Sequence, residues 1–125
     1  MDITPLISKD LNIIQSYKSG QFEVSSKQFT TPIIVLPKHI LEWDVSDVYN
    51  ITEADFDQIL DNRQDIDILL FGGGNKQQFP EPELRNILQQ NRIAIEAMDT
   101  GAACRTYNLL LAEGRKIAAA LIPFT

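Results

Sequence analysis

The stretch Met98-Asp99-Thr100-Gly101-Ala102-Ala103-Cys104-Arg105-Thr106-Tyr107-Asn108 decides the fold of this 125-residue chain. It follows an apolar run over 93–98 that is typical of a strand, and it opens a run to residue 112 that is typical of a helix. In α/β domains, ligands bind at such strand-to-helix junctions. The stretch therefore indicates an α/β domain and a candidate site at the same place.

The segments around this stretch repeat the same alternation. Apolar runs over 66–71 and 117–122 predict two more strands, and Leu84, Ile87 and Leu88 have the spacing of a helix face. Gly114 is the expected stop of the helix that begins at Thr100. The second half thus predicts β-α-β-α-β, whose crossovers imply parallel strands with right-handed connections.

The first half predicts strands of a different kind. Alternating apolar residues flank Lys18-Ser19-Gly20, which indicates a hairpin within a pattern that starts near Leu6. A β-branched run over 33–36 and a short run over 40–43 predict two further strands, the first covered on both faces. Thr52 then looks like the N-cap of a short helix. We expect a single domain over 1–125 with a mixed central sheet, to which these strands add an antiparallel portion.

Composition excludes several classes of protein. A single cysteine and a single histidine, His39, rule out an internal disulfide and supply no usual zinc or multi-cysteine metal site, so we predict no metal and no cofactor. The net charge of −6 argues against a nucleic-acid binder, which needs clustered Lys and Arg. His39 itself is expected to be a surface residue.

No membrane span or targeting segment is expected. No apolar run approaches the roughly 18 residues of a membrane helix. The start Met1-Asp2-Ile3-Thr4-Pro5 lacks the basic region of a signal peptide and the arginines of a mitochondrial presequence. The cytoplasm is therefore the expected compartment.

Arginine is confined to one half of the chain. Residues 63–125 hold all five arginines, and residues 1–62 hold ten acidic residues against four lysines. Because arginine suits bidentate recognition of carboxylates and phosphates, we expect an anion or protein contact in the second half. The alternative is that these arginines lie on solvated helix faces.

The first candidate junction is Gly72-Gly73-Gly74, directly after the 66–71 strand. Three glycines allow positive φ and close approach of a ligand or of another backbone. The spacing does not match GxGxxG, and Lys76 stands at the wrong offset for a phosphate-binding loop of the GK[ST] type. A tight turn where two backbones cross is the alternative.

The second junction begins at Asp99. If Thr100 caps the helix, the N–H groups of residues 101–103 point outward and favour an anion. Cys104 lies in the first turn, where a thiolate is stabilised, and Arg105 adds positive charge. Helical spacing places Cys104, Tyr107, Asn108 and Leu111 on one face, which we expect to be functional. The opposite face, expected to pack on the sheet, holds Ala102, Thr106, Leu109 and Leu110.

Each of these residues also has a structural alternative. Cys104 can be a buried core residue, since free cysteines are among the most buried residue types. Arg105 can pair with Asp99 or Glu96, and Asp99 can share the capping with Thr100. Tyr107 and Asn108 can anchor a loop by hydrogen bonds instead of contacting a ligand.

Three segments together resemble a known family. Phe71-Gly72-Gly73-Gly74, Phe79-Pro80 and the run from Met98 to Arg115 (MDTGAACRTYNLLLAEGR) are similar to a family of small α/β domains of unknown biochemical function. This family includes a mitochondrial respiratory complex I assembly factor and an adipogenesis-associated vertebrate protein. The resemblance covers nearly the whole chain, and the chain is most similar to free-standing bacterial members.

The resemblance implies a three-layer domain with a mixed central sheet and no established reaction. The mitochondrial relative acts as a non-catalytic partner during assembly of a membrane enzyme. The residues that recur in the family correspond here to Gly72, Gly73, Phe79, Pro80, Asp99, Thr100, Cys104, Arg105, Tyr107 and Asn108.

We therefore predict a non-enzymatic, assembly-factor-like binding module that meets a protein partner or a small anion at 98–108. The alternative is an enzyme with Cys104 as nucleophile, Arg105 as anion clamp and Asp99 as acid or base. A third possibility is a dimer whose interface uses the 99–108 helix face. The candidate binding residues are Gly72, Gly73, Gly74, Asp99, Thr100, Cys104, Arg105, Tyr107 and Asn108.

Overall fold

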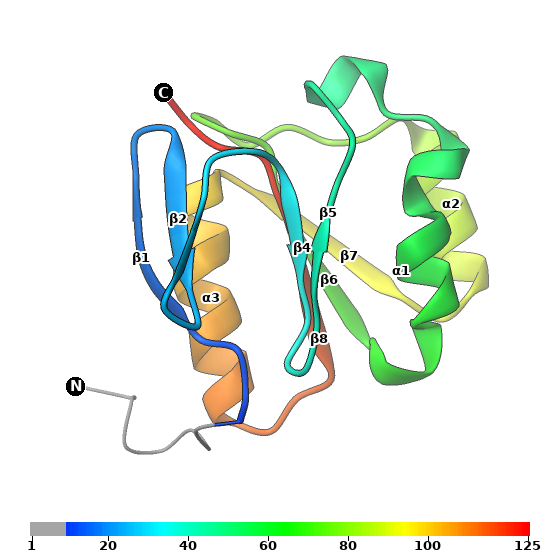
Figure 1. Cartoon of the computed structure of the whole chain (residues 1–125). Helices are drawn as coiled ribbons and strands as arrows, with labels where there is room; N and C mark the ends of the chain where they lie inside the picture. Colours follow the sequence, from blue (N-terminus) through cyan, green and yellow to red (C-terminus); the bar gives the residue numbers. More distant parts are fainter. Residues whose placement is uncertain (1–9) are drawn as a thin grey trace.

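The computed structural model describes residues 10–125 (Figure 1). The expectations for the start of the chain, and the part of the alternating pattern that begins at Leu6, lie outside these residues. The strands and α-helices follow the order β1 (Ile14–Lys18), β2 (Gln21–Val24), β3 (Lys27–Phe29), β4 (Ile33–Val35), β5 (Ile40–Glu42), α1 (Asp57–Asp61), β6 (Ile68–Gly72), α2 (Pro82–Gln90), β7 (Ala94–Met98), α3 (Thr100–Ala112) and β8 (Ile117–Leu121).

A mixed five-stranded sheet forms the centre of the molecule, in the order β5-β4-β8-β6-β7. β6 runs parallel to β7 and β8, because α2 and α3 carry the chain back to the same end of the sheet between consecutive strands. β4 is antiparallel to both β8 and β5. The predicted β-α-β-α-β half and its antiparallel extension are confirmed.

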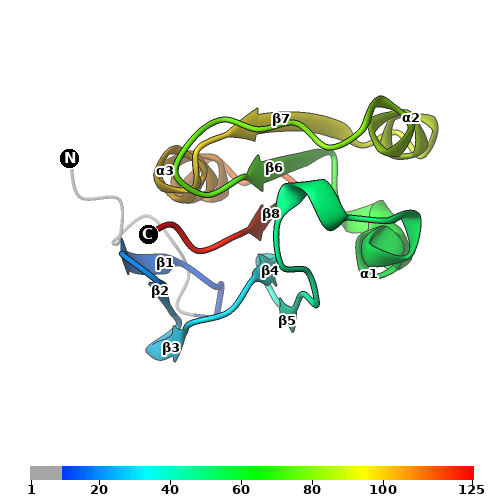
Figure 2. The same ribbon diagram turned by 90° about the horizontal axis from the view of Figure 1, so that it is seen from above.

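Two further layers cover this sheet. In Figure 2, α1 and α2 lie on one side of it, and α3 lies on the other side together with the three-stranded sheet β1-β2-β3. Each side has its own apolar core, and β4 contributes Ile34 to one core and Ile33 and Val35 to the other. β4 is buried on both faces, as its continuous β-branched run predicts. The three-layer α/β fold is confirmed.

The second sheet extends the predicted hairpin by one strand. β1 and β2 meet at a turn where Gly20 has φ +75°, as expected from Lys18-Ser19-Gly20. β3 is an addition that sequence analysis missed. It follows a turn in which Ser25 and Ser26 both have positive φ, at 51° and 66°. Two serines are unusual in that conformation, so the sequence carries none of the usual glycine or asparagine signal.

The helix expected after Thr52 is present but short. It begins as a 3₁₀ turn over Glu53–Phe56 and continues as α1 for one turn. The Thr52 N–H donates to the Asp55 carboxylate at 2.8 Å. This carboxylate thus satisfies the backbone N–H of the N-cap residue at the start of the helix.

α3 has the predicted bounds. Beyond its end Gly114 has φ +76°, and its N–H donates to the Leu111 carbonyl at 3.0 Å. The Arg115 N–H donates to the Leu110 carbonyl at 3.0 Å. This is the glycine stop expected at a helix C-terminus.

Candidate functional site

The two predicted junctions form one continuous structure at the carboxyl edge of β6 and β7. The Gly73 N–H donates to the Met98 carbonyl at 3.1 Å, and the Thr100 N–H donates to the Gly74 carbonyl at 2.9 Å. The glycine loop therefore packs directly against the start of α3.

Thr100 joins three segments of the chain at this point. Its side chain is fully buried; its hydroxyl accepts from the Gly74 N–H at 2.8 Å and donates to the Ile122 carbonyl at 2.6 Å. The expectation that Thr100 caps α3 is wrong, because its hydroxyl is used here. Asp99 is the N-cap, and its carboxylate accepts from the Ala102 N–H at 2.9 Å.

This capping also changes the predicted anion site. Asp99 places a carboxylate at the helix start, and the Ala103 N–H donates to the Asp99 carbonyl at 3.0 Å. Two of the three N–H groups predicted to point outward, those of Ala102 and Ala103, are therefore used within the helix. A free anion at the first turn of α3 would face the Asp99 carboxylate.

The glycines let backbone and side chains pack closely. A Cβ at Gly72 would lie 3.0 Å from Leu121 Cδ2 and 3.1 Å from Thr100 Cα. Gly74 has φ +98°, which a residue with a side chain rarely adopts. All three glycines are buried. The alternative interpretation, a tight turn where two backbones cross, therefore accounts for this loop.

The predicted functional face of α3 is turned into the core. Cys104, Tyr107 and Leu111 are buried in the core that α3 shares with β6, β8 and the β1–β2 hairpin, while Leu109 on the opposite side is 50% exposed. The assignment of the two faces is therefore corrected. Helical periodicity groups residues into faces, but the packing of α3 on β6, β8 and the hairpin determines which face is covered.

Burial also decides the chemistry of Cys104. Loss of solvation raises the pKa of its thiol to about 12, outweighing the nearby Arg105, which lowers it. A nucleophilic cysteine needs an accessible sulfur and a lowered pKa. Cys104 meets neither condition, so the structure offers no support for the enzyme alternative.

Tyr107 and Asn108 anchor the segment that leads into β1. The Tyr107 hydroxyl donates to the Asn12 carbonyl at 2.8 Å, and burial raises the pKa of this hydroxyl. Asn108 accepts from the Ile14 N–H at 2.9 Å and donates to the Ile14 carbonyl at 2.8 Å. The Asn108 amide thus binds Ile14 much as a neighbouring strand would. Both residues take the anchoring role that their alternative interpretation described.

Arg105 is the candidate residue that faces solvent. Its Nη1 donates to the Tyr17 hydroxyl at 2.7 Å, and its guanidinium carbon lies 5.9 Å from the centre of the Tyr17 ring. This hydrogen bond is the main reason that the pKa of Arg105 is raised, and Asp99 contributes less. Tyr17 therefore takes the place of the predicted partners Asp99 and Glu96.

Tyr17 continues the surface toward the C-terminus of the chain. Its ring meets that of Phe124 edge-on, with 6.3 Å between the centroids. The Gly20 N–H donates to the Phe124 carbonyl at 2.7 Å, and the Thr125 N–H donates to Asn75 Oδ1 at 2.8 Å. We call Tyr17, Arg105 and Phe124 the Arg105 patch. Sequence analysis missed Tyr17 and Phe124.

An open hollow of about 360 Å³ adjoins the patch. It is lined by Tyr17, Gly74, Asn75, Asp99, Gly101, Phe124 and Thr125. Two predicted site residues, Gly74 and Asp99, therefore line a surface depression. Thr100, Cys104 and Tyr107 are buried and Asn108 is half-buried, and none of the four lines this hollow.

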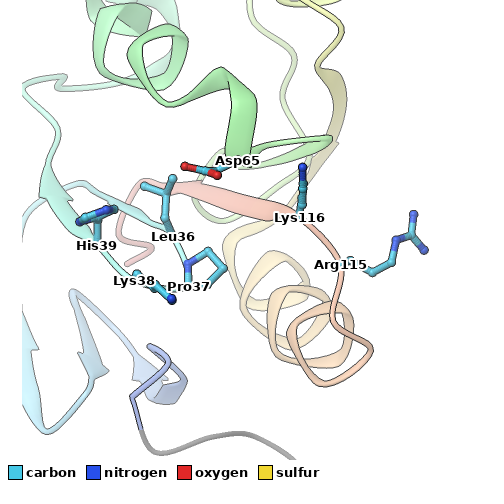
Figure 3. A pocket seen from close by; sticks show the side chains of 7 residues that line it. All are labelled: Leu36, Pro37, Lys38, His39, Asp65, Arg115 and Lys116. Atoms are coloured by element: carbon cyan, nitrogen blue, oxygen red, sulfur yellow. The ribbon is translucent and has the colours of Figure 1, made fainter.

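A second pocket, of about 240 Å³, lies near the beginnings of β6 and β8, at the other end of the sheet (Figure 3). Figure 3 shows Arg115 directed away from it, and Lys116 Nζ donates to the Gln64 carbonyl at 3.3 Å. Asp65 adds a carboxylate to the lining. His39 is exposed here, which confirms its expected surface position. This pocket is separate from the predicted site.

Residues 10–125 also bear on the expectations about a metal site and a membrane span. No group of three or more His, Cys, Asp or Glu in this part of the chain could hold a metal ion. No helix within the same residues has the length and apolar character needed to cross a membrane.

Comparison with known proteins places the chain in a family. A family model described as "Protein of unknown function (DUF498/DUF598)" matches residues 14–122. The mouse (Mus musculus) protein named NADH dehydrogenase (ubiquinone) 1 alpha subcomplex assembly factor 3 is 36% identical over 110 residues, which are 88% of this chain and 60% of that protein. This chain thus spans less than two thirds of that relative's length.

Solved structures agree with this assignment. The crystal structure of a Bordetella parapertussis protein is 36% identical with a TM-score of 0.84, covering 90% of this chain and 96% of that one. A crystal structure described as an outer membrane protein from Bartonella henselae is 33% identical with a TM-score of 0.85, covering 94% and 98%. The chain belongs to the DUF498/DUF598 family, and the resemblance found in the sequence is confirmed.

Proposed function

We propose that this member of the DUF498/DUF598 family is a non-catalytic, assembly-factor-like module that binds a protein partner through the Arg105 patch. The observation that carries the proposal is the division of the 98–108 stretch. Thr100, Cys104, Tyr107 and Asn108 are committed to buried packing and hydrogen bonds, whereas Arg105 stands on the surface.

The composition of the patch suits a protein interface. Tyrosine and arginine are the residue types over-represented among energetic hot spots, and aromatic residues are enriched at interfaces generally. Tyr17 holds Arg105 by a hydrogen bond and by its ring, so the guanidinium loses less side-chain freedom when a partner binds. The group that Arg105 would contact is a carboxylate or a carbonyl oxygen of the partner.

Hydrogen bonds anchor the segments that carry the patch. Tyr107 ties α3 to Asn12, and Asn108 ties it to Ile14, the first residue of the strand that carries Tyr17. Phe124 is held by Gly20 through its carbonyl. The three side chains of the patch come from β1, α3 and the C-terminal segment. The hydrogen bonds that join these segments therefore fix the positions of the side chains relative to one another.

The assembly role in this proposal comes from the relatives. The mouse relative is named as an assembly factor, and an assembly factor acts by contacting other proteins. This chain matches 60% of that protein, so the assembly role is extended to it here as a proposal.

The test is affinity capture with chemical crosslinking from the source cells. We compare the unmodified chain with Arg105→Glu, which reverses the charge of the patch, and with Arg92→Glu as the matched control. Arg92 is equally an exposed arginine, but it lies in the turn between α2 and β7. We expect a partner whose yield falls about tenfold or more with Arg105→Glu and is unchanged with Arg92→Glu. Equal capture by all three proteins contradicts the assignment of the surface.

A second experiment tests the non-catalytic part of the proposal. The purified chain is incubated with a metabolite library, and each compound is followed by mass spectrometry. We expect no turnover by either the unmodified protein or Cys104→Ala. Turnover that disappears in Cys104→Ala would overturn the proposal.

A further inference from the structure

Two large aromatic side chains are exposed beside each other on the side of the sheet opposite the Arg105 patch. Tyr49 is 84% and Phe79 is 55% exposed, and both line a groove of about 530 Å³. We call it the Phe79 groove; its lining residues are Val48, Tyr49, Phe79, Pro80, Glu81, Pro82 and Arg85. Adjacent exposed apolar side chains are typical of interaction surfaces in soluble domains.

The groove is formed by segments with fixed conformations. Tyr49 lies in a 3₁₀ turn, Val48–Asn50, capped by Asp47, whose Oδ1 accepts from the Tyr49 N–H at 2.8 Å. Pro80 and Pro82 fix φ on either side of Glu81, at the start of α2. Val48 and Pro80 are buried and form the base. A partner would therefore meet a preformed surface at little cost in ordering.

Arg85 supplies a cation at one end of the groove, whose lining also includes Glu81. The Arg85 guanidinium carbon lies 5.4 Å from the centre of the Phe79 ring. Its Nε is buried, and among the described residues it is the one buried side-chain N or O atom that lacks a hydrogen-bond partner. Glu81 and Glu83 already place carboxylates at the start of α2, so the group available to an incoming carboxylate is the Arg85 guanidinium.

We propose that the Phe79 groove binds a peptide segment of a protein partner in which an acidic residue stands next to a large apolar one. The apolar side chain packs between Tyr49 and Phe79, and the carboxylate binds the Arg85 guanidinium. This pairing uses the exposed aromatic rings and the Arg85 guanidinium together. The groove belongs to the α1/α2 layer, so the inference stands independently of the proposed function of the Arg105 patch.

The test is selection of a random 12-residue peptide library displayed on phage against the purified chain. We expect enriched sequences that place Asp or Glu next to Phe, Leu or Trp. The best synthetic peptide is then titrated into ¹⁵N-labelled protein. Saturable shifts are expected at the amides of residues 48–49, 79, 81 and 83–85.

Three variants show which side chains bind the peptide. Phe79→Ser and Arg85→Gln are expected to weaken binding of the selected peptide at least about tenfold, since both remove a central contact. Leu109→Ser removes an apolar side chain of similar exposure, 50%, from the other side of the sheet, and binding should be unchanged. Urea unfolding of each variant shows that the fold is retained.

Several results overturn the proposal. These are enrichment of basic or uncharged peptides, the absence of any enrichment, or shifts confined to the Arg105 patch. Shifts at residues 48–49, 79, 81 and 83–85 that grow with protein concentration alone would assign the groove to a second copy of this chain, and would also overturn the proposal.

Discussion

Replacing Thr100 by valine tests whether the most buried polar residue of the 98–108 stretch is structural. Valine keeps the shape of the side chain but removes the hydroxyl. The Gly74 N–H loses its acceptor at 2.8 Å, and the Ile122 carbonyl loses its donor at 2.6 Å. Both backbone groups are then left unpaired in a buried site.

The size of the effect follows from those two groups. Leaving one buried polar group unpaired costs about 1–3 kcal/mol, and the added methyl group offsets a part of this. We expect a loss of about 3 kcal/mol in the free energy of unfolding. At a urea dependence of about 1.5 kcal/mol/M, the unfolding midpoint would fall by about 2 M.

The assay is equilibrium urea unfolding followed by circular dichroism. Thr106→Val is the matched control, because Thr106 is half-buried on the same helix and the substitution is identical. We expect a change of less than about 0.5 kcal/mol for this control. A loss below about 1 kcal/mol for Thr100→Val would refute the reasoning, and would leave the Thr100 hydroxyl available for a ligand.

Three further predictions concern the same region. Gly72→Ala should destabilise the fold by about 1–3 kcal/mol in urea unfolding, because its Cβ would lie 3.0 Å from Leu121 and 3.1 Å from Thr100; an unchanged midpoint would refute this. Iodoacetamide should leave Cys104 unlabelled by mass spectrometry in the native chain at pH 8, where a pKa of about 12 leaves about one thiolate in ten thousand, and should label it in urea. Rapid native labelling would contradict the burial of Cys104.

The third prediction is that stability falls with rising pH above pH 9, where the unfolded chain releases the Cys104 proton that the folded chain keeps up to about pH 12. Cys104 lowers the free energy of unfolding by about 1.4 kcal/mol per pH unit in this range. Tyr107, whose pKa is also raised, adds to this loss at higher pH. Urea midpoints measured from pH 8 to 11 test this. A weaker pH dependence in Cys104→Ala is expected, and an identical one would contradict it.

Local signals in the sequence were enough to predict most of the fold. Apolar periodicity and Gly114 predict α3 with its observed bounds, and the crossover lengths predict parallel β6, β7 and β8. Thr100 and Asp99 are both good N-cap residues, so the sequence alone could not decide between them. The buried Ile122 carbonyl, 22 residues further along the chain, takes the Thr100 hydroxyl and leaves the cap to Asp99.

The parts that the sequence did not reveal depend on contacts between distant residues. Arg105 meets Tyr17 across 88 positions, and no spacing rule connects a helix residue to a strand so far away. Cys104 and Tyr107 pack in the core that α3 shares with β6, β8 and the hairpin, which reverses the expected faces of α3. The candidate stretch was correctly located, but the exposed or buried state of its residues follows from tertiary packing.

The most direct test of the central claim is site-specific photo-crosslinking in the source cells. A photoreactive phenylalanine analogue replaces Phe124 in the patch, or Arg92 in the control position. We predict a discrete crosslinked protein from position 124, lost when Arg105→Glu is added, and none from position 92. Crosslinks from position 124 that persist with Arg105→Glu, or that arise equally from position 92, would contradict binding through the Arg105 patch.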